Sequence, residues 1–217
     1  MKLASAEDTF TIRERIPRHL GPHQLMSDKS NGYDEIAHHF IAARNSRIGP
    51  RLVREWAETL PAGAAVLDLA CGHGIPNGPV LAEQGFDLYA VDASPTLLAE
   101  YRKRFPHAHT DCATAEDSDF FGRQFDAVIA WGLMFLLPLE NQRLVISKVA
   151  RVLKPGGKFL FTSVKDEVRW KDSLTDRDSY SPGVEWYRRA LSEDGFVVER
   201  EESDEGENYN FFARKSP

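Results

Sequence analysis

The sequence predicts an α/β fold in which a mostly parallel sheet is covered by helices on both faces. From residue 65 onward, short apolar runs alternate with helical stretches, and strands that alternate with helices form parallel sheets buried on both sides. The chain then ends in two short runs, residues 196–201 and 208–214, that flank Asp204-Glu205-Gly206-Glu207, a pattern typical of an antiparallel hairpin. The 217 residues, 42% of them hydrophobic, are enough for one domain with a sizeable core.

The N-terminal region precedes this alternating pattern. Residues 1–30 contain Pro17, Gly21 and Pro22 with weak hydrophobic periodicity, so we expect a partly ordered arm, and residues 31–217 form a single domain. Apolar side chains at helical spacing then predict two helices, over residues 33–41 and 52–60, separated by Gly49-Pro50.

The alternating pattern predicts five strands and three connecting helices, and local signals mark several of their ends. Ser94-Pro95 places an N-cap before a proline at the first helical position, and Gly85 follows its helix as a C-cap does. Pro155-Gly156-Gly157 stops the last of the three helices. The predicted strands cover residues 65–69, 87–91, 107–111, 125–131 and 158–164, the third being the weakest. The predicted helices lie near residues 79–84, 94–104 and 140–153.

Composition narrows the classes of partner. The formal net charge of −6 argues against a nucleic-acid partner, because such proteins usually present a basic face to the phosphates. Cys71 and Cys112 have no second Cys or His at metal-ligand spacing, so we expect neither a disulfide framework nor a metal site. The N-terminus lacks the apolar core of a signal peptide and no run of 18 apolar residues occurs. We therefore expect a cytoplasmic protein without a membrane partner.

A glycine-rich loop followed by an acid is the main functional signal. The first strand runs into Asp68-Leu69-Ala70-Cys71-Gly72-His73-Gly74, where glycines allow a sharp turn and a close approach to a ligand. The second strand ends at Asp92, 20 residues after Gly72, a spacing that suits an acid accepting hydrogen bonds from two ribose hydroxyls. A plain tight turn and a solvated strand end are the alternatives.

These residues resemble the signature of class I S-adenosylmethionine-dependent methyltransferases. Residues 66–74 read V-L-D-L-A-C-G-H-G, with Ala70 where the family usually has glycine. The resemblance covers roughly residues 33–215 and implies a Rossmann-like, seven-stranded, mostly parallel sheet between helices, with the last strand antiparallel in the C-terminal hairpin. Further segments that match the family in order are residues 91–94, 114–117, 125–130 and 153–157.

The resemblance implies a role for each motif toward S-adenosylmethionine, whose product is S-adenosylhomocysteine. The loop of the first strand would hold the methionine part, with Asp68 near the amino group. Asp92 would bind the ribose, and Ala115 and Glu116 would lie along the adenine. Trp131 would stand where the methionine part and the acceptor meet, and Tyr33 would lie on a helical lid. The residues expected at the cofactor are therefore Tyr33, Asp68, Ala70, Gly72, Gly74, Asp92, Ala93, Ala115, Glu116 and Trp131.

Methyl transfer from this cofactor is an in-line displacement, so the enzyme contributes mainly positioning, worth roughly 7–11 kcal/mol. His73 is not favoured as a general base, because a loop histidine is more often a spacer or a surface group. Without a convincing base, an acceptor that is already nucleophilic is preferred: an amine, a ring nitrogen, or a sulfur or selenium anion. Three segments are expected to bind this acceptor. They are the N-terminal arm and helix, residues 132–135 after the fourth strand, and residues 165–182, which include Asp172 and Thr175 and are long for a connection. Their candidate residues are Phe40, Arg44, Met134, Phe135, Trp170 and Tyr180.

Other readings remain open at this point. A nicotinamide-dependent oxidoreductase shares the glycine loop and the acid, but it predicts neither the closing hairpin nor the 153–157 turn. A non-catalytic or regulatory protein that binds the cofactor, and a protein or RNA methyltransferase, are the main alternatives. We expect a small-molecule acceptor, and a chain that acts as a monomer or a homodimer.

Overall fold

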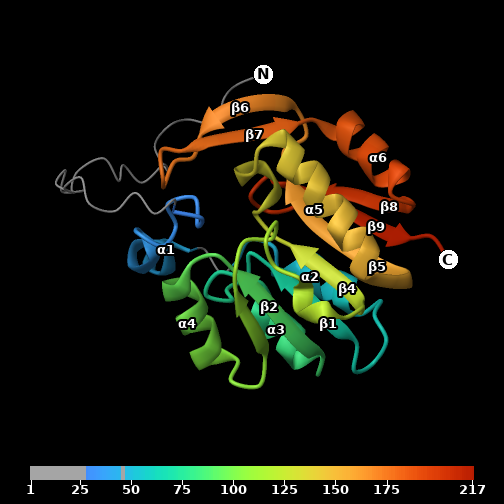
Figure 1. Ribbon diagram of the computed structural model, residues 1–217, viewed down its shortest axis with the longest axis horizontal. Coiled ribbons are helices and arrows are strands. Elements are labelled where there is room, and N and C mark those ends of the chain that lie inside the picture. Colours follow the sequence, from blue (N-terminus) through green and yellow to red (C-terminus); the bar gives the residue numbers. More distant parts are fainter. Residues whose placement is uncertain (1–27, 45–46) are drawn as a thin grey trace.

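The computed structural model describes residues 28–44 and 47–217, and its centre is a seven-stranded sheet (Figure 1). The strands lie side by side in the order β3-β2-β1-β4-β5-β9-β8. All neighbours pair in parallel except β9, which runs antiparallel to both β5 and β8. Strand bounds are β1 Ala65–Leu69, β2 Asp87–Asp92, β3 His109–Cys112, β4 Phe125–Ala130, β5 Leu153–Ser163, β8 Phe196–Ser203 and β9 Tyr209–Lys215.

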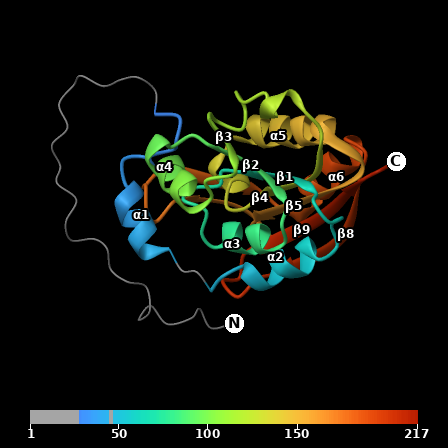
Figure 2. The ribbon, with the colours of Figure 1, turned by 90° about the horizontal axis from the view of Figure 1, so that it is seen from below.

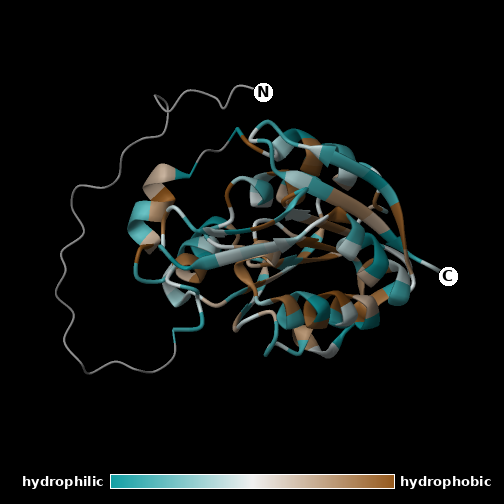
Figure 3. Cartoon of the chain, turned by 90° about the horizontal axis from the view of Figure 1, so that it is seen from above, coloured by the Kyte–Doolittle hydropathy of each residue, from teal (hydrophilic) through white to brown (hydrophobic). Residues whose placement is uncertain are grey.

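Helices cover both faces of the sheet (Figure 2). Helices α2, Pro50–Ala57, and α3, Asn77–Glu83, pack on one face, and α5, Leu139–Val152, and α6, Val184–Glu193, pack on the other. Helix α4, Pro95–Arg104, joins the first group, because Leu98 packs with Ala90. Figure 3 shows hydrophobic residues gathered on the strands and on the inward sides of the helices. Among the described residues, no helix has the length and apolar character needed to span a membrane.

The predicted fold class is confirmed, and so is the antiparallel terminal hairpin. Strand β1 occupies the predicted residues, all five of them buried, because a central parallel strand packs on both faces and therefore reads as an uninterrupted apolar run. Strand β5 begins earlier than predicted, at Leu153, which pairs with Phe125 before a β-bulge. Residues 153–157, which were expected to form a turn before the fifth strand, are thus the first part of β5.

The structure corrects three parts of the prediction. Residues 165–182 are not an irregular connection, since β6, Glu167–Lys171, and β7, Asp178–Pro182, form a separate two-stranded hairpin. Helix α6 follows and was not predicted. The first predicted helix, over residues 33–41, begins only at α1, Ala37–Ala43, after a series of turns. The predicted arm lies outside the described residues except for 28–30.

Candidate ligand-binding site

A cavity of about 250 Å³ opens at the carboxyl edge of the sheet. The loops after β1, β2, β3 and β4 all reach this edge, because parallel strands end on the same side, and the strand order reverses between β1 and β4. The N-terminal segment and Asp172, which follows β6, line the cavity from the other side. The sheet thus forms the floor of the cavity, and residues distant in sequence form its roof.

The loop after β1 owes its shape to left-handed backbone conformations. Ala70 has φ +55°, Gly72 has φ +55° and Gly74 has φ +89°. At Gly74 an added Cβ would lie 2.4 Å from the Phe105 ring, whereas at Gly72 it would meet only Phe40, at 3.8 Å. Gly74 is therefore needed for packing, and Gly72 for its conformation beside the cavity. Ala70 adopts the conformation that favours glycine at a cost of about 1–2 kcal/mol.

Asp68 places a buried carboxyl in the cavity wall, with 2% of the residue exposed. Burial, and then the neighbouring Asp92 carboxylate, raise the pKa of Asp68 to about 8. No described residue donates a hydrogen bond to this carboxyl or forms an ion pair with it. An acid left in this state is suited to a cationic group supplied from outside the chain, because a charge partner would recover the desolvation cost of ionisation.

Asp92 ends β2 and also lines the cavity. Its Oδ2 accepts the Gly72 N–H at 2.7 Å, and its Oδ1 accepts the Ser94 N–H at 2.8 Å. Burial raises the pKa of Asp92 to about 6, although these two N–H groups oppose the shift. Because each carboxylate oxygen has a second lone pair, Asp92 can accept two further hydrogen bonds from a ligand.

The loop after β3 brings Thr114, Ala115 and Glu116 to the cavity. Ala115 is buried, and the Glu116 carboxylate is held by Asn141 Nδ2 at 2.7 Å. The Asp117 N–H donates to Thr114 Oγ1 at 3.1 Å. These contacts fix a turn whose backbone forms one end of the cavity.

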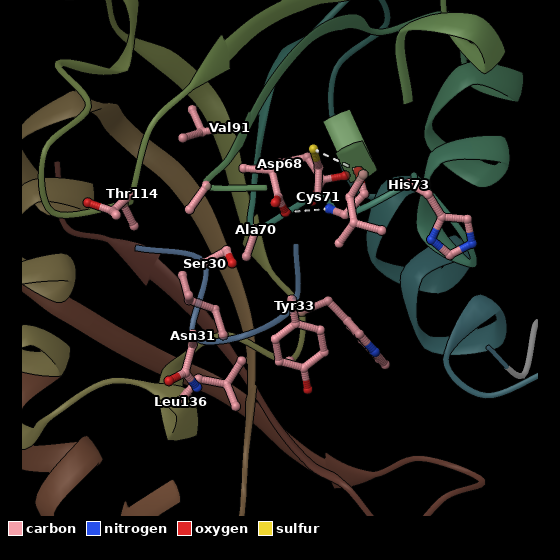
Figure 4. A pocket seen from close by; sticks show the side chains of 18 of the residues that line it. Ser30, Asn31, Tyr33, Asp68, Ala70, Cys71, His73, Val91, Thr114 and Leu136 are labelled. Atoms are coloured by element: carbon pink, nitrogen blue, oxygen red, sulfur yellow. Dashed lines mark hydrogen bonds between the residues drawn. The ribbon is translucent and has the colours of Figure 1, made fainter. Parts of the chain in front are cut away.

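The N-terminal segment roofs the cavity through contacts with three separate elements. Tyr33 Oη donates to Asp172 Oδ2 at 3.0 Å, which joins the segment to the end of β6. Asp34 Oδ1 accepts Ser94 Oγ–H at 2.6 Å and the Thr96 N–H at 3.0 Å, which joins it to the start of α4. Figure 4 shows Ser30, Asn31 and Tyr33 facing the β1 loop across the pocket. Burial and the Asp172 carboxylate raise the pKa of Tyr33, so the phenol is neutral.

Phe40, Arg44 and His73 lie together near the β1 loop. The Phe40 ring makes an edge contact with His73, and the Arg44 guanidinium lies 5.6 Å from the Phe40 centroid. Arg44 Nε donates to the Ile75 carbonyl at 3.4 Å, and burial lowers the pKa of Arg44. His73 is not a surface group, because only 2% of it is exposed.

The protonation state of His73 follows from its surroundings. Burial first, then Arg104 and Arg44, lower the pKa of His73 to about 4. The imidazole is therefore neutral at pH 7, and its Nδ1 has no hydrogen-bond partner among the described residues. In Figure 4 the ring points away from Asp68 and Tyr33.

The structure brings most of the predicted residues to one cavity. All ten residues expected at the cofactor line it, as do Phe40, Arg44 and Phe135. Three residues expected at the acceptor do not. Met134 is fully buried in the main core, because the short 3₁₀ helix Met134–Leu136 turns it inward. The Trp170 ring packs on Phe135, at 5.6 Å between ring centroids, and the Tyr180 ring packs against the Arg169 guanidinium on the β6–β7 hairpin.

Several lining residues were not singled out from the sequence. Asn31 and Asn77 carried no motif. Of the apolar residues after β4, Leu136 and Leu137 also line the cavity; they directly follow the expected 132–135 segment, so the apolar run was a usable signal. Asp172, by contrast, was a candidate of the 165–182 segment together with Trp170, Thr175 and Tyr180, and of these four only Asp172 lines the cavity. Within the described ranges, no group of three or more His, Cys, Asp or Glu side chains is arranged to hold a metal.

The sequence is similar to those of known methyltransferases. Residues 66–157 match the family model described as a methyltransferase domain. An uncharacterized methyltransferase of Synechocystis sp. is 37% identical over 109 residues, half of each chain. The demethylmenaquinone methyltransferase of Renibacterium salmoninarum is 30% identical over 137 residues, 63% of this chain and 55% of the relative. The chain thus spans about half the length of the curated relatives it matches.

A solved structure extends the likeness to nearly the whole fold. The 1,6-didemethyltoxoflavin-N1-methyltransferase of Burkholderia thailandensis superposes with a TM-score of 0.71 over 94% of each chain, at 16% identity. Similarity at this level of identity shows a shared fold, and the identity of the ligands has to be argued from the site itself.

Proposed function

We propose that this protein transfers the methyl group of S-adenosylmethionine to a small molecule. The match of residues 66–157 to a methyltransferase domain model and the shared fold support this proposal. The observation that carries the proposal is the pair of buried carboxyls, Asp68 and Asp92, in a cavity at the carboxyl edge of the sheet. Because neither Asp68 nor Asp92 forms an ion pair with a described residue, the two acids are suited to a ligand that brings a cationic group and hydroxyl donors.

The residues present fit this cofactor. Asp68, which no described donor satisfies, suits an ammonium group. Asp92, with lone pairs to spare beyond the Gly72 and Ser94 N–H groups, suits a vicinal diol. When bound, S-adenosylmethionine supplies a methyl group that its sulfonium has already activated toward displacement.

The chain's own contribution is to hold and enclose the reactants. Trp131, Leu133 and Phe135 form an apolar wall after β4, and Phe40 extends it from α1. This wall offers water few hydrogen-bond partners, and the N-terminal segment, anchored by Tyr33 and Asp34, covers the cavity from the other side. Holding two reactants in line in this way contributes roughly 7–11 kcal/mol without any covalent participation by the protein.

We place the acceptor between the apolar wall and the Tyr33–Asp172 pair. Asp172 is 9% exposed, and among the described residues it forms no ion pair. Its Oδ1 is occupied by the turn that follows β6, whereas Oδ2 receives only the Tyr33 hydroxyl. An acceptor that presents an N–H or O–H to Oδ2 would be oriented there. The Burkholderia enzyme, crystallised with 1,6-didemethyltoxoflavin and S-adenosylhomocysteine, supports a small organic acceptor.

The test starts with calorimetric titration of the full chain with S-adenosylmethionine and with S-adenosylhomocysteine. We expect binding of both, followed by methyl transfer from radiolabelled cofactor to some member of a panel of amines, thiols and phenols. A protein that binds neither ligand refutes the cofactor assignment. A protein that binds both but methylates only proteins or RNA refutes the small-molecule acceptor.

The acceptor position is tested with Asp172→Asn, which keeps the size of the side chain but removes its charge. We expect the KM for the acceptor to rise about tenfold or more, since a hydrogen bond to a charged group is worth roughly 1.5–3 kcal/mol. Cofactor affinity should change little. Asp178→Asn, on the same hairpin but paired with Lys171 at the surface, is the control. Equal effects of the two variants would contradict this placement.

A further inference from the structure

Lys148, on α5, is bound in an unusual way for a lysine. Its Nζ donates to three backbone carbonyls, those of Ala115 at 2.8 Å, Glu116 at 2.6 Å and Ser118 at 2.7 Å. Among the described residues it forms no ion pair, and the ammonium also lies 4.5 Å from the centroid of the Phe120 ring. All three hydrogen-bonding capacities of the ammonium are thus used on one loop.

Lys148 binds the loop that follows β3, and this loop forms one end of the cavity. Helix α5 contacts this loop twice on one face, because Asn141, two turns before Lys148, binds the Glu116 carboxylate. Within the loop, the Ser118 N–H donates to the Thr114 carbonyl at 3.0 Å. The loop is therefore held by hydrogen bonds to side chains of α5 and by the hydrogen bond of its own turn.

Because Lys148 binds the Ala115 carbonyl, the direction of the N–H group in the same peptide is also determined. A trans peptide directs its C=O and N–H to opposite sides, so a carbonyl of Ala115 turned toward Lys148 turns the Glu116 N–H away from α5. No described residue accepts a hydrogen bond from the N–H of Ala115 or of Glu116, and both residues line the cavity. A cation behind the peptide plane also polarises it, which strengthens the N–H as a donor.

We propose that Lys148 is a positioning residue that sets the backbone N–H donor of Glu116 for a ring nitrogen of a purine ligand. This inference rests on the proposed function, because adenine is the purine of S-adenosylmethionine. A lysine that merely holds the fold together would stabilise the protein without favouring one base over another. A lysine that aims this donor at the base contributes to discrimination among purines.

The experiment compares the wild type with Lys148→Met by calorimetric titration. Lys215→Met is the matched control, because Lys215 Nζ also donates to a backbone carbonyl, that of Leu153 at 2.8 Å, but does not line the cavity. Three ligands are titrated: S-adenosylhomocysteine, S-inosylhomocysteine, whose N1 carries a proton, and the 3-deaza analogue, which lacks N3. Each analogue removes one ring nitrogen as an acceptor.

We expect the wild type to bind one of the two analogues about tenfold more weakly than S-adenosylhomocysteine, the usual cost of an unmade hydrogen bond. Lys148→Met should lower the affinity for S-adenosylhomocysteine about tenfold and for that analogue no more than about twofold. Lys215→Met should leave both affinities unchanged.

Equal losses for all three ligands in Lys148→Met would overturn the inference in favour of a purely structural role. A wild type that does not discriminate among the ligands would overturn it without any variant, so the test does not depend on Lys148→Met folding. A wild type that binds none of the three would instead overturn the proposed function.

Discussion

Asp68→Asn tests the proposed role of the buried acid, because it removes the charge and nearly preserves the shape. With a pKa of about 8, about nine in ten free protein molecules carry the Asp68 proton at pH 7. An ammonium bound beside the carboxyl favours its ionised form, so binding should release this proton. We expect the wild type to release about 0.9 proton per S-adenosylhomocysteine bound at pH 7. Asp92, with a pKa of about 6, adds only about 0.1.

The assay is calorimetric titration in buffers of different ionisation enthalpy. The slope of the observed enthalpy against the buffer's ionisation enthalpy counts the protons released. Asp68→Asn should reduce the slope to about 0.1 and weaken binding about tenfold or more, as the loss of a hydrogen bond to a charged group does. A wild-type slope near zero, or an unchanged slope in the variant, would refute the reasoning.

The pH dependence of the stability of the free protein is a second measurement of the Asp68 pKa, and the direction of the change can be predicted. Between about pH 4 and pH 8 the folded protein keeps a proton on Asp68 that the unfolded chain has released, so this group lowers stability as pH rises through that window. At 1.36 kcal/mol per pKa unit, the loss at pH 7 reaches at most about 4 kcal/mol. Asp68→Asn should flatten this part of the pH profile in urea denaturation.

The control is Asp126→Asn, because the pKa of Asp126 is shifted in the opposite direction from that of Asp68. Burial would raise the pKa of Asp126, but Lys154 at 2.7 Å and the Ala65 N–H at 2.9 Å outweigh it and hold the pKa below its usual range. The variant should therefore lose stability at pH 7, whereas Asp68→Asn should gain it.

Two further outcomes concern the same cavity. Asp92→Ala should weaken binding of S-adenosylmethionine at least about tenfold, at roughly 1.5–3 kcal/mol for each lost hydrogen bond to a charged group; unchanged affinity in the same titration would mean that the acid is misassigned. His73→Ala should retain most of the methyl-transfer rate, because its pKa of about 4 leaves little driving force for taking up a proton near pH 7. A drop of about a thousandfold, within the range that a lost general base produces, would establish His73 as a base.

The sequence was sufficient where the signal is local. Strand β1 and the terminal hairpin follow from runs and turns that neighbouring residues define. The sequence also predicted an acid, Asp92, at the end of the second strand, and the structure ends β2 there; the hydrogen bond from the Gly72 N–H to Asp92 at 2.7 Å was not foreseen. Such local features can be predicted from sequence because a strand, a loop and a helix of ordinary length can be connected in few ways.

Helix α6 shows a signal that was present and not used. Its buried residues, Val184, Tyr187, Ala190 and Leu191, recur at helical spacing. The β6–β7 hairpin is different, because β6 is mostly exposed and its pairing with β7 depends on a turn six residues long. A strand that buries no continuous face leaves little trace of its partner in the sequence.

The amino-acid sequence by itself determined the order of the elements, the motif loops and the acids that end two strands. Only the tertiary structure decided which side chains share the cavity. In the folded chain the Met134 side chain lies in the core, and His73 is buried and neutral. Asp172 forms a hydrogen bond with Tyr33, which is 139 positions away in the sequence. The physical reason is that burial, pKa and long-range contacts depend on what packs around a residue, which its sequence neighbours do not specify.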